Sequence, residues 1–150
     1  AFSQCECHQC DCLEGDDVLG LIATGDDSTG IYSADKDMQT LPANLWSNDE
    51  RFFFPQHEAV ADWYWMMQTL TGDTTDGYPG LPSIGKKRAA DMLGEPGERP
   101  LADLWDQVVR AYEAKGLTED DALIQARCAR ILRNTDFVEG EIKLWTPPKS

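Results

Sequence analysis

The sequence has few basic residues for its number of acidic ones. Its 150 residues include 27 aspartates and glutamates but only 13 lysines and arginines, which gives a formal net charge of −14. A chain with this charge is repelled by polyphosphates, so indiscriminate binding of nucleic acid through overall charge is excluded. Either the protein avoids nucleic acid, or some of its carboxylates hold cations and a local basic patch meets the phosphates.

The sequence also lacks long apolar runs and a secretion signal. No stretch approaches the roughly 20 apolar residues that a membrane-spanning helix needs. The N-terminal AFSQCECHQC has neither a basic segment nor an apolar core, so it is not typical of a signal peptide. A mass of 16.8 kDa and a hydrophobic fraction of 41% predict one domain with a real core. The organised pattern starts almost at Ala1, which suggests a fragment or a processed product.

Cysteine is scarce outside one cluster near the N-terminus. Four of the five cysteines lie in CECHQCDC, together with a histidine. Thiols and an imidazole this close together could hold zinc, but separations of two residues also fit an extended strand with small, partly buried side chains. Crowded thiols without a secretion signal indicate a reducing compartment, so we expect a cytoplasmic protein. The zinc candidates are Cys5, Cys7, His8, Cys10 and Cys12.

The apolar pattern predicts mixed α/β structure first and mostly helices afterwards. Helices are predicted over 13–24, from about 57 to 70, from about 86, over 101–116 and over 118–134. Extended segments are predicted over 30–37 as a strand, 51–54 as a strand or buried connection, and 141–148 as a strand or tail. Gly116 and Thr118 are the predicted caps of the last two helices. We expect Trp63, Tyr64 and Cys128 to lie in the core.

Acidic residues gather in three clusters along the chain. They lie at the start of the first helix, at the end of the strand predicted over 30–37, and after the second helix. Carboxylates at such positions can converge where ligands bind to α/β sheets, and a few carboxylates hold Mg²⁺ together with water and phosphate. Taken singly, each cluster is better explained by solvated caps and turns, and only the combination with the turn that follows favours a functional site. The clusters are Glu14, Asp16 and Asp17; Asp35 and Asp37; Asp73 and Asp76.

The third cluster leads directly into the glycine-rich GYPGLPSIGKKRAADML, which places a tight turn before a helix. Glycines permit close backbone approach, and a helix N-terminus offers free N–H groups to an anion. The cations Lys86, Lys87 and Arg88 are unfavourable in a first helical turn unless an anion is near. A nucleic-acid phosphate satisfies this arrangement, as in a helix–hairpin–helix that contacts the backbone and not the base edges. The alternative is a plain helix–turn–helix joint with incidental lysines.

The motifs LEGDDVLGLIA, SADKDMQTLP and GDTTDGYPGLPSIGKKRA, in this order, resemble the 5′-nuclease (flap endonuclease-like) superfamily. The resemblance is strongest to the C-terminal half of the 5′→3′ exonucleases of T7-like bacteriophages. It covers roughly 13–147 and includes LTEDDALIQARCARILRN and EIKLWTPP. It implies an α/β fold with the C-terminal part of a PIN-like nuclease core over 1–56. A helical DNA-binding region with a helix–three-turn–helix element would follow over 57–150.

The resemblance implies an exodeoxyribonuclease that uses two Mg²⁺ or Mn²⁺ ions and cuts at 5′ ends or flaps of DNA, and also RNA in hybrids. It makes metal ligands of all seven residues in the three acidic clusters and names no other catalytic side chain. The turn would grip duplex DNA, and in this family it often holds K⁺ through main-chain carbonyls. The chain would act in the host cytoplasm if it is phage-encoded. The implied DNA-binding residues are Gly80, Ser83, Gly85, Lys86, Lys87 and Arg88.

The sequence departs from the family in two places. Family members carry a further N-terminal half with another metal-binding aspartate and a basic helical arch, and these features are not found before Leu13. Ser83 stands where the family commonly has glycine. We therefore expect a C-terminal fragment whose isolated chain could be inactive. The alternatives are a non-catalytic duplex-binding module that pairs with a separate N-terminal half, and a small thiol metalloprotein built on the N-terminal cysteines.

Overall fold

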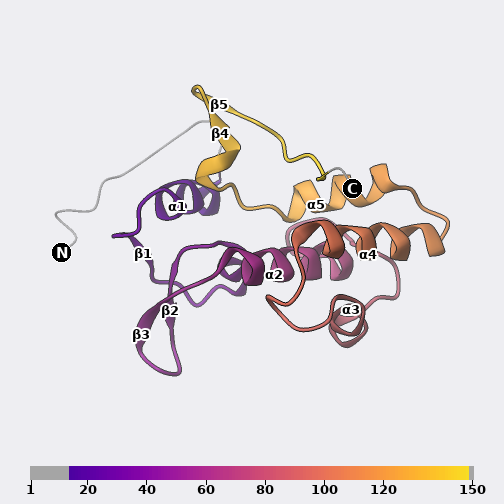
Figure 1. Ribbon diagram of the computed structural model, residues 1–150, viewed down its shortest axis with the longest axis horizontal. Coiled ribbons are helices and arrows are strands. Elements are labelled where there is room, and N and C mark those ends of the chain that lie inside the picture. Colours follow the sequence, from indigo (N-terminus) through magenta and orange to yellow (C-terminus); the bar gives the residue numbers. More distant parts are fainter. Residues whose placement is uncertain (1–13, 149–150) are drawn as a thin grey trace.

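The computed structural model describes residues 14–148 and places a small sheet beside a group of helices (Figure 1). Within these residues, no helix has the length and apolarity needed to cross a membrane. The elements are, in chain order, α1 (Gly15–Thr24), β1 (Gly30–Ile31), the 3₁₀ helix η2 (Lys36–Thr40), β2 (Asn44–Ser47), β3 (Phe52–Pro55), α2 (Glu58–Thr71), α3 (Lys86–Leu93), α4 (Leu101–Ala114), α5 (Glu119–Ala129), the 3₁₀ helix η3 (Asn134–Asp136), β4 (Phe137–Val138) and β5 (Glu141–Ile142).

The larger sheet has the strand order β1–β2–β3. β1 runs parallel to β2, with Ile31 opposite Leu45, and β2 runs antiparallel to β3, with Leu45 opposite Phe54. These three residues share one face of the sheet and belong to the smaller of two hydrophobic clusters. The segment 51–54 is therefore part of a strand and not a buried connection. Phe52 and Phe53 remain about half exposed.

The strand predicted over 30–37 is much shorter in the structure. β1 ends at Ile31, and the chain then turns into η2. The Asp35 carboxylate caps this 3₁₀ helix by accepting a hydrogen bond from the Asp37 N–H at 2.9 Å. Aspartate favours such caps because its side chain satisfies a free backbone donor. The prediction that Asp35 and Asp37 end a strand was wrong, since both lie on a helical turn beyond it.

The larger hydrophobic cluster surrounds α2, which packs against α3, α4 and α5. The helix predicted from about 57 to 70 is confirmed, and Trp63 is buried as expected. Tyr64 is only partly buried, whereas Trp65 and Met66 are completely buried. Because helices cover α2 on several sides, its buried surface is wider than the single apolar stripe that the sequence indicates.

The predicted signals between α4 and α5 are confirmed, but α5 ends earlier than predicted. Gly116, just beyond α4, has φ +80, a conformation that favours glycine after a helix. Thr118 caps α5 as predicted, since its Oγ1 accepts a hydrogen bond from the Asp121 N–H at 3.2 Å. However, α5 ends at Ala129, five residues before the predicted end at 134. Contacts with other elements hold the residues after α5 in an extended form.

The extended segment 130–133 contacts α1, η2 and α2. The Leu132 N–H donates to Asp17 Oδ1 at 3.1 Å, which ties the segment to α1. The Arg133 guanidinium lies 2.8 Å from Asp62 Oδ1 on α2 and donates to the Thr40 carbonyl at 2.9 Å. This ion pair is buried, so the loss of either partner would leave an uncompensated charge. These long-range contacts outweigh the local helical pattern.

The prediction that Cys128 lies in the core was wrong, because its side chain is exposed. The helix α5 buries a narrow face of small residues, and position 128 falls on another side of it. The residues of this buried face are Ala122, Ala126 and Ala129.

The segment predicted over 141–148 as a strand or tail is both. It begins with β5, which pairs with β4, and continues as an extended chain. In that tail the Trp145 ring packs edge-on between Trp65 at 4.6 Å and Trp105 at 5.1 Å. The tail is therefore fastened to the helical core.

Candidate metal centre and nucleic-acid interface

The acidic turn after α2 is shaped by two glycines that pack backbone to backbone. Gly72 and Gly80 have φ +69 and +66, and a Cβ on Gly80 would lie 2.3 Å from the Gly72 amide nitrogen. A side chain at either position is therefore incompatible with this packing. Asp73 and Tyr78 exchange two backbone hydrogen bonds of 2.8 and 3.1 Å. This reversal fixes Asp73 and Asp76 just beyond the end of α2.

Asp73 holds the turn in shape. Its Oδ1 accepts hydrogen bonds from the N–H groups of Thr75 at 3.0 Å and Asp76 at 3.3 Å, and its Oδ2 lies 3.4 Å from Lys36 Nζ. Burial opposes ionisation, but the Asp76 N–H and the Lys36 charge outweigh it and lower the pKa of Asp73. Asp73 is consequently an oriented carboxylate at neutral pH.

Three carboxylates from two separate segments come together at this turn. Asp37 from η2 and Asp73 and Asp76 from the turn each offer one oxygen, and these oxygens lie within 4.8 Å of one another. Carboxylates at this spacing repel each other unless a cation lies between them. Hard divalent cations such as Mg²⁺ bind to oxygen ligands of this kind. The three residues therefore form a candidate metal centre.

A chain of hydrogen bonds orients Asp37. Gln68 Nε2 donates to Asp37 Oδ1 at 2.8 Å, and Gln68 Oε1 accepts from the Tyr78 hydroxyl at 3.2 Å. Burial raises the pKa of Asp37, the charge of Asp35 raises it further, and the Gln68 bond opposes both. Sequence reasoning missed Gln68 and Tyr78 because it followed charge, and neither side chain is ionised at neutral pH.

The first turn of α1 contributes a further carboxylate, Asp16, whose pKa responds to other acidic residues. Burial raises the pKa of Asp16, and the charges of Asp35, Glu14, Asp17 and Asp76 add to this effect in that order. Charges influence one another strongly only over short distances in salt solution. Asp16 from the first motif lines the same cavity as Asp76 from the third, although it is outside the compact group of three.

The remaining acidic residues of the first motif differ in their surroundings. One carboxylate oxygen of Asp17 accepts a hydrogen bond from the Leu132 N–H, which links α1 to the segment after α5. Glu14 is exposed at the N-cap position of α1 and makes no side-chain capping bond. Both residues nevertheless line the same cavity as Asp16 and Asp76.

This cavity has a volume of about 510 Å³ and opens beside the candidate metal centre. Its lining combines acidic side chains from the start of α1 and from the turn after α2 with residues of α5 and the segment after it. Such a volume exceeds that of a hydrated ion with a phosphate group, since one water occupies about 30 Å³ in the liquid. The lining residues are Glu14, Asp16, Asp17, Thr75, Asp76, Arg127, Cys128, Arg130 and Ile131.

The basic turn that precedes α3 has the features of an open anion site. Ser83 has φ +66, which explains why glycine suits this position. Gly85 occupies the N-cap position of α3 without a side-chain capping bond, and Lys86, Lys87 and Arg88 are exposed in the first helical turn. The first N–H groups of such a helix lack intrahelical partners and attract anions.

Gly80, which the resemblance makes a DNA-binding residue, packs inside the protein. Its N–H donates to Gln125 Oε1 on α5 at 2.9 Å, and the residue is buried. This amide is thus engaged within the protein, and Gly80 serves the close packing against Gly72. The predicted zinc cluster at Cys5, Cys7, His8, Cys10 and Cys12 lies outside the described residues.

Comparison with known proteins gives several relatives. The exonuclease of Escherichia phage T7 is 34% identical over 90% of this chain and 56% of the phage protein. The exodeoxyribonuclease of Enterobacteria phage T3 is 33% identical over the same shares. The 5′-3′ exonuclease of Mycobacterium tuberculosis is 30% identical over 71% of this chain and 38% of that protein. These similarities support the assignment of the chain to the 5′-nuclease superfamily.

The similarity to the phage exonucleases supports the resemblance that the ordered acidic motifs indicate. The chain spans about half the length of the curated phage relatives that it matches. No family model matches it, and no solved structure does. The mixed α/β architecture of residues 14–148 is compatible with a 5′-nuclease domain.

Proposed function

We propose that the chain is part of a divalent-metal-dependent 5′→3′ exodeoxyribonuclease, or flap endonuclease, that acts on DNA. The observation that carries this proposal is the convergence of Asp37, Asp73 and Asp76, whose oxygens lie within 4.8 Å of one another. Relatives named exonuclease and exodeoxyribonuclease support the reaction class. The RNA strand of a hybrid would be a further substrate.

Two Mg²⁺ or Mn²⁺ ions would be held by carboxylates from all three acidic motifs. An all-oxygen ligand group suits these hard cations better than zinc or copper. When bound, they supply Lewis-acid activation of water and stabilise charge on the reacting phosphate. The chain itself orients the ligands, because Gln68 fixes Asp37 and the backbone N–H groups of the turn fix Asp73. The proposed ligands are Glu14, Asp16, Asp17, Asp35, Asp37, Asp73 and Asp76.

The turn before α3 would grip the DNA backbone as a helix–hairpin–helix does. The uncapped helix start and the exposed Lys86, Lys87 and Arg88 support this role. Main-chain carbonyls of the turn would hold K⁺ there, which adds positive charge next to an acidic protein. In this proposal residues 1–56 belong to the α/β nuclease core and 57–150 to the DNA-binding region.

The proposal is tested with duplex DNA that carries a label at its 5′ end or on a 5′ flap. The protein should release labelled nucleotides with Mg²⁺ or Mn²⁺ and should release none in EDTA. As a control, Asp103→Asn removes an exposed carboxylate of α4 and should cleave like the parent. Metal-independent release, or release from 3′ ends alone, would contradict the proposed function.

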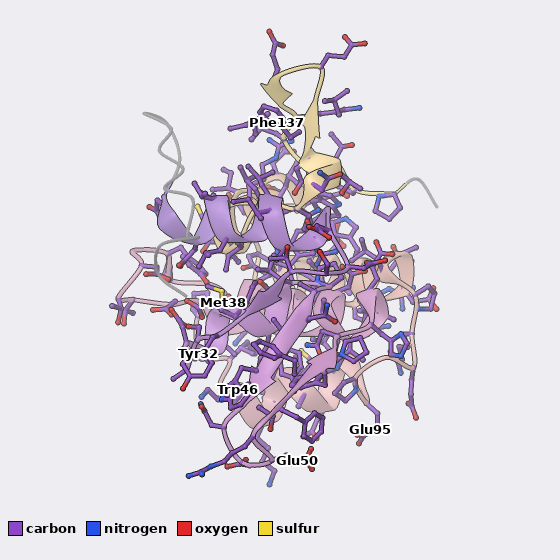
Figure 2. The ribbon with its side chains drawn as sticks, turned by 90° about the vertical axis from the view of Figure 1, so that its left-hand side faces the viewer. Tyr32, Met38, Trp46, Glu50, Glu95 and Phe137 are labelled. Atoms are coloured by element: carbon purple, nitrogen blue, oxygen red, sulfur yellow. The ribbon has the colours of Figure 1, made fainter. Side chains whose placement is uncertain are left out.

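A second candidate is a duplex-binding half of a split nuclease that is inactive by itself. The exposed face of the sheet favours it: Tyr32 is 74% exposed, and its ring centroid lies 5.1 Å from that of Trp46 (Figure 2). The Trp46 ring in turn packs on Phe53, with 5.1 Å between the ring centroids. Exposed apolar patches of this kind mark interaction sites. A further nuclease segment would cover this face, in keeping with the 56% coverage of the phage relatives.

The second candidate predicts that cleavage requires a separately supplied N-terminal nuclease half. Tyr32→Ser with Phe53→Ser should prevent this complementation, because both rings would lie in the contact. Phe137→Ser changes an equally exposed ring on β4 and should leave complementation intact. If the chain alone cleaves as fast as the mixture, the split arrangement is wrong and the enzyme interpretation stands.

A further inference from the structure

The cavity beside the candidate metal centre is also lined by basic residues. Arg127 on α5 and Arg130 just beyond it line the same cavity of about 510 Å³ as Asp16 and Asp76. Neither arginine forms an ion pair with these two carboxylates. The lining therefore contains carboxylates and guanidinium groups that do not neutralise one another by direct pairing.

Arg130 is already engaged within the protein. Its Nε and Nη2 donate to the two oxygens of Asp136, both at 2.9 Å. Its guanidinium also lies over the Trp65 ring at 4.4 Å from the centroid. A bidentate pair with a carboxylate uses the geometry that arginine would otherwise offer to a phosphate. Arg130 is consequently a structural residue of the cavity lining.

Arg127 is held in a different way. Its Nε donates to the Trp145 carbonyl at 3.0 Å, and the Trp145 ring is fixed between Trp65 and Trp105. Among residues 14–148, the two terminal amino groups of Arg127 have no hydrogen-bond partner and no ion pair. The stem of the side chain is thus oriented while its outer edge stays available.

We propose that Arg127 binds a phosphate of the nucleic-acid strand in the cavity that it shares with Asp76 and positions that strand at the metal centre. This inference rests on the proposed function. A guanidinium matches phosphate oxygens with paired N–H donors. Carboxylates alone repel a phosphate, so the strand needs positive charge in this cavity, from metal ions at the carboxylates and from Arg127. Arg127 acts here as a positioning residue.

The test is binding of a 5′-ended duplex, measured by fluorescence anisotropy at several salt concentrations with Ca²⁺ and with the DNA checked for integrity. Arg127→Gln should weaken binding about fivefold and reduce the salt slope by about one, because one phosphate contact is lost. Arg127→Lys should restore the slope. Arg110→Gln, an exposed arginine of α4, is the matched control and should bind like the parent.

A purely structural role of Arg127 in anchoring the tail predicts another result. Both Arg127 variants would then lower the unfolding midpoint, and the salt slope would stay at the parent value. A second variant avoids the contact between Arg127 and the tail. Cys128→Glu adds a negative charge at an exposed position of the same cavity lining and should weaken binding without changing stability.

The outcomes separate this inference from the proposed function. If the parent binds and cleaves DNA but Arg127→Gln and Cys128→Glu keep its affinity and salt slope, Arg127 does not contact the strand and only this inference is overturned. If the parent itself neither binds nor cleaves DNA, with or without an N-terminal half, the proposed function and this inference are both overturned.

Discussion

The acidic turn at 73–76 and the basic turn at 83–88 are neighbours in sequence but are built differently. Asp73 accepts two backbone hydrogen bonds and pairs with Lys36, and its turn is locked by the contact of Gly72 with Gly80. By contrast, the side chains of the first turn of α3 are exposed. The acidic turn is a fixed arrangement of like charges, whereas the basic turn is an exposed surface of positive charge.

In the proposed function, this difference would allow an acidic protein to bind a polyanion. The repulsion among carboxylates is concentrated where burial and neighbouring charges raise the pKa values of Asp16 and Asp37, and bound cations would relieve it there. The proposed attraction to phosphate lies outside this region, at the start of α3. We therefore expect chemistry and binding to respond to different substitutions.

Removal of a carboxylate from the acidic turn should give the largest effect. Asp76→Ala is expected to lower cleavage about a thousandfold, because a metal ligand supplies several kcal/mol to the transition state. DNA binding should stay within about twofold of the parent, because the substitution removes a charge that repels phosphate together with a metal ligand. Single-turnover cleavage and anisotropy measure the two quantities. Cleavage by Asp76→Ala at the parent rate would rule out this ligand assignment.

The packing of the acidic turn should be the next most sensitive feature. Gly80→Ala is expected to lower the free energy of unfolding by about 3 kcal/mol, because it adds a clash with Gly72 to an unfavourable φ. Gly77→Ala is the matched control: its φ is +84, but a Cβ there meets nothing within 4 Å, so about 1 kcal/mol is expected. Denaturant unfolding of both variants checks this. Equal losses would show that the backbone contact is unimportant.

The basic turn should affect binding and not chemistry. Lys86→Ala with Lys87→Ala is expected to weaken duplex binding about tenfold or more and to reduce the salt slope by about two. Cleavage at saturating DNA should be unchanged. Lys115→Ala, at the far end of α4, is the control for a general loss of positive charge. An unchanged salt slope in the double variant would place the DNA elsewhere.

The smallest expected effect is on stability without metal. The pKa of folded Asp37 is raised, so its favourable contribution is present below the unfolded pKa and is lost as pH rises through the folded one. Asp37→Asn should therefore stabilise the metal-free protein at neutral pH by less than about 1 kcal/mol. Its Oδ1 can still accept from Gln68.

Asp26→Asn gives the opposite sign and serves as the control. Hydrogen bonds from Ser28 and Thr29 lower the pKa of Asp26, so its neutral replacement should lower stability at neutral pH. Added Mg²⁺ should stabilise the parent more than Asp37→Asn, because a ligand that binds the folded state more tightly stabilises it more at the same concentration. Thermal unfolding in EDTA and in Mg²⁺ decides this, and equal gains in Mg²⁺ would count against Asp37 as a ligand.

Local signals predicted the helices well. The cap at Thr118 and the glycine after α4 act within one turn, so the sequence shows them directly. The predictions failed where distant contacts decide the structure. Arg133 and Leu132 leave the helical pattern because Asp62 and Asp17 hold them extended, and Cys128 is exposed because α5 buries a stripe of alanines.

The candidate site divides in the same way. Charge and spacing pointed to Asp37, Asp73 and Asp76, which the fold does bring together. The uncharged orienting residue Gln68 left no signal, because its role depends on contact between α2 and η2. The contribution of Arg127 likewise depends on a cavity that forms only when α5 packs near α1.

Binding of Mn²⁺ to the DNA-free protein, followed by electron paramagnetic resonance, tests the central claim most directly. The account predicts tight binding by the parent and by Asp103→Asn, and loss of that binding in Asp37→Asn with Asp76→Asn. It needs neither substrate nor another nuclease segment. If the double variant binds Mn²⁺ as tightly as the parent, the convergence of the acidic motifs is not a metal centre.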